Sequence, residues 1–209
     1  MNGRGGMPRP GDAIALLCVV VWTCAACATH TFGLWTAFGI TGAVLAAVVL
    51  VFARPALWGA GLPGRGWAIG IAAGVAMAMA TEWLTPPVLA LTPRLAADVA
   101  QLFVELHRPG PLVAWVLMPP IVVCEEIVWR GAVQAAVTRR TGWRPAVAVV
   151  SCLYALAHLP TGSLALVLTC LAAGACWGVV RAMTDSLPAT IATHLAWDLL
   201  VLLIEPPLR

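Results

Sequence analysis

Apolar segments that are about as long as a membrane is thick make up most of this chain, and they restrict its fold more than any other feature. Seven of them occur, at about residues 13–32, 35–53, 67–84, 111–138, 145–159, 163–181 and 187–204. A helix needs roughly 20 apolar residues to cross the hydrocarbon core, and all segments except the short fifth approach or exceed that length. The runs are continuous rather than alternating, which argues against a barrel of strands. We therefore expect an all-α fold, a polytopic transmembrane helical bundle with about seven spans.

The composition supports a single membrane domain over residues 1–209. Hydrophobic residues make up 61% of the chain and charged residues only 10%, whereas roughly a quarter of a soluble domain is charged. The net charge is +3, and the arginines that produce it are scattered. This pattern excludes the dense basic surface of a nucleic-acid-binding protein. We therefore expect an integral membrane protein in contact with the lipid bilayer.

The segment at residues 88–108 has a different pattern. Its apolar residues recur at the spacing of one helical face, whereas its polar residues fall on the other faces. The apolar face comprises Leu91, Leu95, Val99, Leu102 and Leu106, and the polar set comprises Arg94, Asp98, Gln101, Glu105 and Arg108. This pattern predicts an amphipathic helix that lies at the membrane interface or covers the bundle, and does not cross.

The arginines predict which way the chain crosses the membrane. If the N-terminus is inside and residues 88–108 do not cross, the inner set is Arg4, Arg9, Arg54, Arg65, Arg139, Arg140, Arg144 and Arg181, and the outer set is Arg94, Arg108 and Arg209. Basic residues concentrate in cytoplasmic loops. We therefore expect a cytoplasmic N-terminus and an outer C-terminus. The lack of lysine is typical of a GC-rich genome, which suggests a bacterial plasma membrane.

Three ionisable residues lie inside the fourth apolar segment, namely Glu125, Glu126 and Arg130. Charge at bilayer depth is costly and commonly marks a functional site. Glu126 and Arg130 are four residues apart, so they share a helix face and can form an ion pair that braces the helix. Glu125 is rotated by about 100° from Glu126 and can face the bundle interior. A carboxylate in that position is suited to act as a general base.

Two later segments carry further polar pairs. Tyr154 and His158 are four residues apart, as are His194 and Asp198. At 1.5 Å per residue, Glu125, His158 and His194 lie within about two helical turns of the same depth, so we expect three helices to form one polar site. Asp198 could orient His194. Glu125, His158 and His194 could bind a divalent metal such as zinc, but H-E-x-x-H is absent, and we expect no obligatory metal.

These residues resemble the motifs of the CPBP family, the membrane-embedded CAAX-processing and bacteriocin-processing proteases. The family pattern is E-E-x-x-x-R, then F-x-x-x-H, then H-x-x-x-N or a related polar residue. Here the three motifs run from Glu125 to Arg130, from Tyr154 to His158 and from His194 to Asp198. Tyrosine stands in place of phenylalanine, and aspartate in place of asparagine. The resemblance covers about residues 111–204.

The resemblance implies that Glu125, His158, His194 and Asp198 are catalytic and that Glu126, Arg130 and Tyr154 support them. Glu125 would activate a water molecule that His158 helps to hold, and His194 with Asp198 would stabilise the oxyanion. An ionised aspartate cannot donate a hydrogen bond to an oxyanion as an asparagine can. Asp198 is therefore either protonated or limited to orienting His194.

The main hypothesis is thus an intramembrane endopeptidase, a CPBP-type hydrolase that cleaves a peptide or protein substrate in or at the membrane. Two alternatives stay open. One is an immunity or binding protein that uses the same scaffold without proteolysis. The other is a proton-coupled transporter, because Glu, His and Asp in membrane helices also relay protons. A transporter often has internal repeats, and no other segment repeats the E-E-x-x-x-R run.

Overall fold

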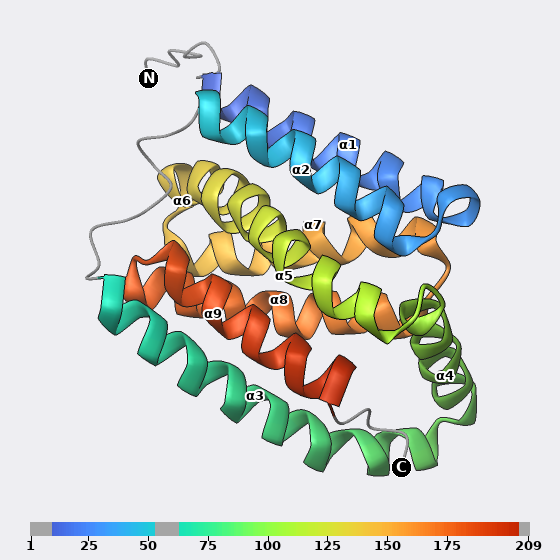
Figure 1. Ribbon diagram of the computed structural model, residues 1–209. Coiled ribbons are helices and arrows are strands. Elements are labelled where there is room, and N and C mark those ends of the chain that lie inside the picture. The colour runs from blue at the N-terminus through green and yellow to red at the C-terminus, as the bar shows by residue number, and fades with distance from the viewer. Residues whose placement is uncertain (1–9, 53–62, 205–209) are drawn as a thin grey trace.

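The computed structural model describes residues 10–52 and 63–204, and helices form nearly all of this part of the chain (Figure 1). In order, the elements are α1 (Pro10–Phe32), α2 (Leu34–Phe52), α3 (Pro63–Leu91), α4 (Pro93–His107), α5 (Pro111–Glu126), the π-helix η2 (Ile127–Val133), α6 (Gln134–Thr141), α7 (Trp143–His158), the short 3₁₀-helix η3 (Leu159–Thr161), α8 (Leu164–Thr184), α9 (Leu187–Asp198) and the π-helix η4 (Leu199–Ile204). No strand occurs among the described residues. The predicted all-α fold is therefore confirmed.

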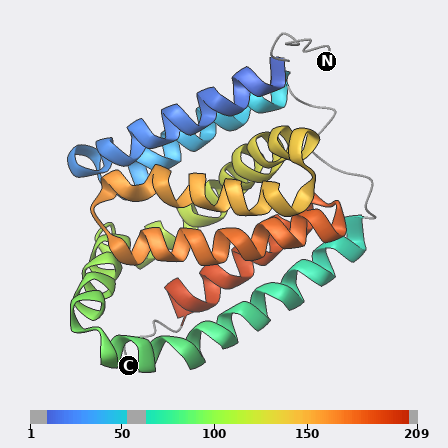
Figure 2. The same cartoon turned by 180° about the vertical axis from the view of Figure 1, so that it is seen from behind.

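The helices form a bundle in which several members are long and apolar enough to be transmembrane helices. In the described part of the chain, α1, α2, α3, α8 and the continuous segment from α5 to α6 are long and apolar enough to cross a membrane. The helix α7 and the segment from α9 into η4 are shorter. These segments correspond to the seven apolar segments of the sequence. Successive segments run in alternating directions along the bundle (Figures 1 and 2).

The third helix is longer than the sequence predicted, and the amphipathic helix is correspondingly shorter. α3 continues through Pro86 and Pro87 instead of ending near residue 84. The amphipathic helix α4 begins at Pro93, so the predicted start at residue 88 is wrong. The break falls at Thr92 because a following proline disfavours helical geometry in the residue before it. Pro93 itself suits the first position of a new helix.

The helix α4 lies across one end of the bundle (Figure 1), and Arg94 and Arg108 lie near its two ends. At the opposite end, Arg139 and Arg140 of α6 pair with Asp12 of α1, with N–O distances of 3.5 and 2.6 Å. This separation of the arginines between the two ends agrees with the prediction that α4 does not cross the membrane. Arg4, Arg9, Arg54 and Arg209 lie outside the described residues. Which end faces the cytoplasm stays a prediction.

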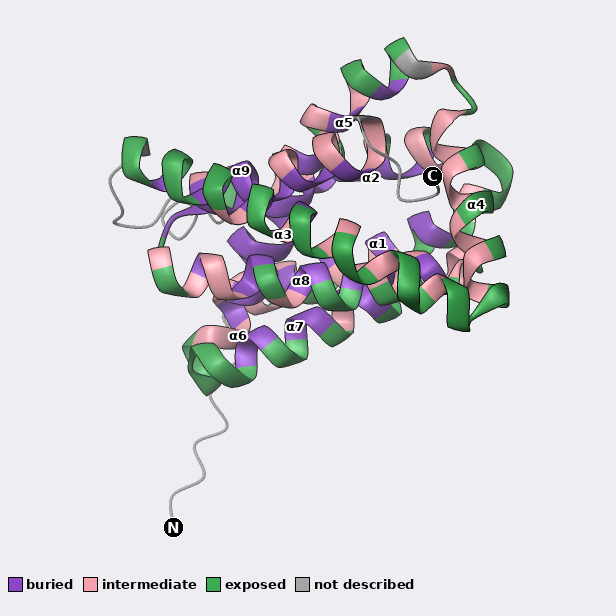
Figure 3. Ribbon diagram, turned by 90° about the horizontal axis from the view of Figure 1, so that it is seen from below, coloured by how far each residue is buried: buried purple, intermediate pink, exposed green. Residues whose placement is uncertain are grey.

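Many large apolar side chains of this bundle are exposed, whereas several ionisable side chains are buried. Figure 3 shows where buried and exposed residues fall along the helices. Leu16, Val51 and Trp83 are between 66% and 79% exposed, whereas Glu126 and Arg130 are at most 1% exposed. Lipid can cover the outer apolar surface, but it cannot hydrogen-bond to a charged group. The buried charges must therefore find their partners inside the bundle.

Close packing of α3 against α9 positions one wall of that interior. A Cβ atom added at Gly70 would press on the backbone oxygen of Ala189 and lie 2.7 Å from the Cβ of Ala192. At Gly74 it would lie 2.5 Å from the backbone oxygen of Thr193. The sequence Gly70-x-x-x-Gly74 predicts a close helix contact, and the structure identifies its partner as α9. This contact positions α9, which carries His194.

We expect Gly70→Ala to lower the stability of the protein by about 1–3 kcal/mol, as overpacking does in a dense interior. The contacting atom is a backbone oxygen, so α9 as a whole must shift. Gly64→Ala is the matched control, since a Cβ added there meets nothing within 4 Å. The measurement is the thermal unfolding midpoint in detergent. Equal midpoints for the two variants would contradict the predicted contact.

Candidate active site

Both helices that carry the expected carboxylates change to π-helix directly after them. α5 ends at Glu126 and η2 begins at Ile127; α9 ends at Asp198 and η4 begins at Leu199. A π-helix has a wider turn with i→i+5 hydrogen bonds and is frequent at functional sites. One such bond joins the backbone N–H of Gln134 to the carbonyl of Trp129. The composition of these segments is compatible with ordinary α-helix, so no sequence signal predicted the change.

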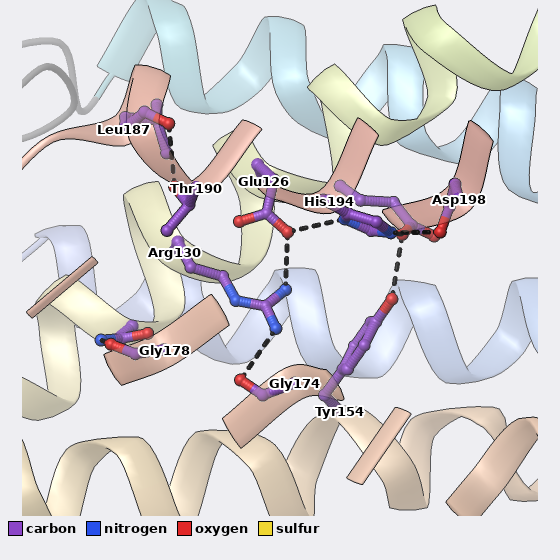
Figure 4. A network of polar contacts seen from close by, with 11 residues as sticks. Glu126, Arg130, Tyr154, Gly174, Gly178, Leu187, Thr190, His194 and Asp198 are labelled. Atoms are coloured by element: carbon purple, nitrogen blue, oxygen red, sulfur yellow. Dashed lines mark hydrogen bonds and ion pairs between the residues drawn. The ribbon is translucent and has the colours of Figure 1, made fainter. Parts of the chain in front are cut away.

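Glu126 and Arg130 form the buried ion pair that their spacing predicts (Figure 4). Nη1 of Arg130 donates to Oε1 of Glu126 at 3.0 Å, and Nη2 donates to the backbone oxygen of Gly174 at 3.1 Å. The guanidinium carbon lies 4.9 Å from the ring centre of Tyr154 and 5.1 Å from that of Trp177. Its charge is therefore stabilised by a carboxylate, a carbonyl and two aromatic faces. The pair links η2 to α8.

The same carboxylate also orients His194. Nδ1 of His194 donates to Oε1 of Glu126 at 2.9 Å, because a carboxylate paired with Arg130 accepts but does not donate. The indole of Trp177 stacks on the imidazole, with ring centres 3.5 Å apart. The sequence suggested Asp198 as the orienting group, but the structure gives this hydrogen bond to Glu126. Helix spacing could not reveal it, because the two residues lie on different helices.

The other nitrogen of His194 lies between two carboxyl groups. Nε2 is 3.8 Å from Oε2 of Glu125 and 3.5 Å from Oδ1 of Asp198. Glu125 also accepts a hydrogen bond from the hydroxyl of Tyr154 at 2.9 Å. Glu125 and Glu126 thus have different partners, as the rotation between adjacent helix positions predicts. The structure brings Glu125, Tyr154, His194 and Asp198 together.

His158 lies in the same site, but both of its ring nitrogens are engaged. Nδ1 lies 2.8 Å from the backbone oxygen of Tyr154, which can only accept, so Nδ1 carries the proton. Nε2 then accepts a hydrogen bond from the indole N–H of Trp22 at 3.2 Å. The ring of Phe38 lies 5.1 Å away, centre to centre. Sequence reasoning missed Trp22, because a tryptophan in an apolar span carries no signal of its own.

A cavity of about 210 Å³ opens beside these groups. Glu125, Tyr154, His158, His194 and Asp198 all contribute to its lining, and most of the other lining side chains are apolar. Space of this kind beside a few convergent polar groups is typical of a site for a small or extended ligand.

The amphipathic helix α4 covers part of this cavity. Its side chains Val99, Leu102, Phe103 and Leu106 contribute to the lining. Two hydrogen bonds attach the helix to its neighbours. Asp98 accepts from the backbone N–H of Ala165 on α8 at 2.6 Å, and the indole of Trp35 on α2 donates to the backbone oxygen of Leu106 at 2.9 Å. Of the apolar face that the sequence indicated, Val99, Leu102 and Leu106 line the cavity, whereas Leu91 belongs to α3 and is 84% exposed.

The suggested metal ligands do not fit a metal ion in this arrangement. Nδ1 of His158 carries a proton and Nε2 accepts from Trp22, so His158 would have to give up the hydrogen bond from Trp22 before it could join Glu125 and His194 around a metal ion. In the part of the chain that the structure describes, no three His, Cys, Asp or Glu side chains are grouped as metal ligands.

Comparison with known proteins agrees with this arrangement. Residues 108–200, a little under half of the chain, match the family model described as type II CAAX prenyl endopeptidase Rce1-like. The match includes all three motifs, from Glu125 to Asp198, and it confirms the resemblance to the CPBP proteases. Neither a curated protein nor a solved structure matches the chain. The helices α1 to α4, including Trp22 and the apolar face of α4, lie outside the matched residues.

Proposed function

We propose that this integral membrane protein is an intramembrane endopeptidase, because residues 108–200 match the model of the Rce1-like CAAX endopeptidases. Its substrate is a peptide or protein in or at the bilayer. One observation carries the proposal. The carboxyl group of Glu125 faces the cavity beside Nε2 of His194, while Glu126 is held by Arg130. The carboxylate of Glu125 is thus available to react, whereas that of Glu126 holds Arg130 in place.

In the proposed reaction Glu125 is the general base. A water molecule in the cavity gives a proton to Glu125 as its oxygen attacks the carbonyl carbon of the scissile bond. The electron pair of the carbonyl moves to its oxygen, which becomes an oxyanion. When the tetrahedral intermediate collapses, the carbon–nitrogen bond breaks and Glu125 returns the proton to the leaving amine. A base placed in this way contributes about 10²- to 10⁴-fold to the rate.

The histidines have separate tasks in this proposal. His194, when Nε2 carries a proton, can donate a hydrogen bond to the oxyanion, and Asp198 lies 3.5 Å from the same nitrogen to balance that charge. His158 can help to hold the water once Nε2 accepts from the water in place of Trp22. We further propose a bacterial plasma membrane and a cytoplasmic N-terminus, which the arginine distribution supports.

The test is a comparison of the membrane peptides of cells that produce either the natural protein or Glu125→Ala. A protease leaves product peptides in the first cells and intact substrate in the second. Glu105→Ala serves as a matched control, because Glu105 lies on the outer face of α4 beside Arg108. Identical peptides in all three strains, with equal amounts of protein, would reject proteolysis.

The same Glu125 variant separates the alternatives. Protection against a peptide toxin that survives Glu125→Ala would identify a non-proteolytic immunity protein. Proton flux into liposomes that contain the purified protein, lost in the variant, would identify a transporter.

A further inference from the structure

We propose that the hydroxyl group of Tyr154 is a catalytic hydrogen-bond donor that stabilises the oxyanion of the tetrahedral intermediate. This inference rests on the proposed proteolytic function and gives Tyr154 a chemical task beyond support. Oη of Tyr154 already contacts the proposed base, since it donates to Oε2 of Glu125 at 2.9 Å. It also contributes to the lining of the cavity. The donor therefore lies where the attacking water and the scissile carbonyl must meet.

The ring of Tyr154 is held firmly from several sides. Its centre lies 4.9 Å from that of Trp129 and 4.7 Å from that of His158, and the guanidinium of Arg130 covers a face. A Cβ added at Gly174 would lie 3.0 Å from Cδ1 of the ring, so α8 leaves no spare room. A donor whose position is set before the reaction stabilises developing charge without reorganisation.

The site needs such a donor because its carboxyl groups cannot serve while ionised. Glu125 and Asp198 then only accept hydrogen bonds. Of the indole groups that line the cavity, Trp35 donates to the backbone oxygen of Leu106 and Trp197 donates to Oγ1 of Thr81, whereas the N–H of Trp177 is buried without a hydrogen-bond partner among the described residues. Tyr154 brings a neutral O–H into the cavity, and it can act together with Nε2 of His194.

The proposed step follows the movement of charge. Before the reaction, Glu125 is an anion and is the natural acceptor for the hydroxyl of Tyr154. When Glu125 takes the proton of the attacking water, its negative charge is lost and an equal charge appears on the carbonyl oxygen of the substrate. The hydrogen bond of Tyr154 moves to that oxygen, with no transfer of the phenolic proton. When the intermediate collapses and Glu125 gives up its proton, the hydrogen bond returns to Glu125.

Kinetics of Tyr154→Phe give the first test, with the peptide substrate that the membrane-peptide comparison identifies. The variant lacks one oxygen atom and restores the phenylalanine of the family motif, so we expect it to fold. We expect kcat to fall about 10²-fold, the usual cost of losing one oxyanion donor, while KM stays near its original value. A purely structural role would change the unfolding midpoint instead.

The single tyrosine of the chain allows a second test that does not require turnover. Protein labelled with ¹³C at the phenolic carbon gives one tyrosine resonance, from Tyr154. The probe is a leucine-containing peptide difluoroketone, whose hydrate resembles the tetrahedral intermediate. We expect it to shift this resonance and to bind Tyr154→Phe about 10²-fold more weakly. The peptide with an ordinary amide in place of the difluoroketone should bind both proteins alike.

The outcomes distinguish this inference from the proposed function. If Glu125→Gln is inactive while folded Tyr154→Phe keeps its full kcat, or if the difluoroketone leaves the resonance unchanged, the role of Tyr154 is wrong and the protease proposal survives. If Glu125→Gln still cleaves the substrate, the proposed function itself fails. Should Tyr154→Phe not fold, 3,5-difluorotyrosine can replace the single tyrosine. The more acidic phenol should then lose activity at a lower pH than the natural protein does.

Discussion

The purified variant Glu125→Gln is expected to lose cleavage by at least about 10³-fold, within the range that a positioned general base contributes. Glutamine has the shape of glutamate, and its amide oxygen can still accept the hydrogen bond that Tyr154 donates at 2.9 Å. It cannot take a proton from water. The side chain is 11% exposed, so a second water molecule or ion has little room to act as a replacement base. The measurement is kcat on the identified membrane peptide in detergent or liposomes.

The control for this loss of cleavage is the thermal stability of the variant. Glu125 belongs to no buried ion pair with arginine, so Glu125→Gln should unfold near the same temperature as the natural protein. A variant that folds and keeps more than a tenth of its original kcat would show that another group is the base. Asp198 would then be the next residue to test, because it lies on the other side of Nε2 of His194.

The second large effect is expected from Arg130→Met, which should lower the free energy of unfolding by about 3–5 kcal/mol, as the loss of one partner from a buried ion pair does. Methionine fills much of the volume but leaves Glu126 buried with its charge uncompensated by arginine. It also removes the hydrogen bond that Arg130 donates to the backbone oxygen of Gly174. The measurement is denaturation by SDS in mixed micelles.

A double variant separates charge from packing in this experiment. Glu126→Gln with Arg130→Met removes both charges, so it should recover part of the lost stability. The glutamine oxygen still accepts from Nδ1 of His194, which Glu126 binds at 2.9 Å in the natural protein. If the double variant were less stable than Arg130→Met alone, the ion pair would not be the main contribution of these residues.

The expected effects differ in kind because the two adjacent glutamates face different surroundings. Glu126 and Arg130 hold η2 against α8 and orient His194, so changes there should affect folding first. Glu125 faces the cavity, so its change should affect chemistry first. Helix periodicity alone predicts this separation, since adjacent residues point in directions about 100° apart.

Several features of the site could not be predicted, for a shared reason. The hydrogen bond from His194 to Glu126, the contact of Trp22 with His158 and the cover that α4 places over the cavity all join residues of different helices. Spacing along one helix carries no information about which other helix lies opposite. The π-helices η2 and η4 were also missed, because tertiary packing selects them over α-helix in segments whose composition permits both.

The sequence by itself determined the elements and their chemistry. Bilayer thickness sets the length of an apolar span, and the helical repeat places Arg130 beside Glu126 and turns Glu125 away. The spacing of Gly70 and Gly74 likewise predicts a close helix–helix contact, although it does not identify the second helix. Only the tertiary structure decided the neighbours: α9 for the glycines, Glu126 for His194, and Tyr154 for Glu125. The physical reason is that such partners are selected by the packing of whole helices, which depends on all the facing side chains together.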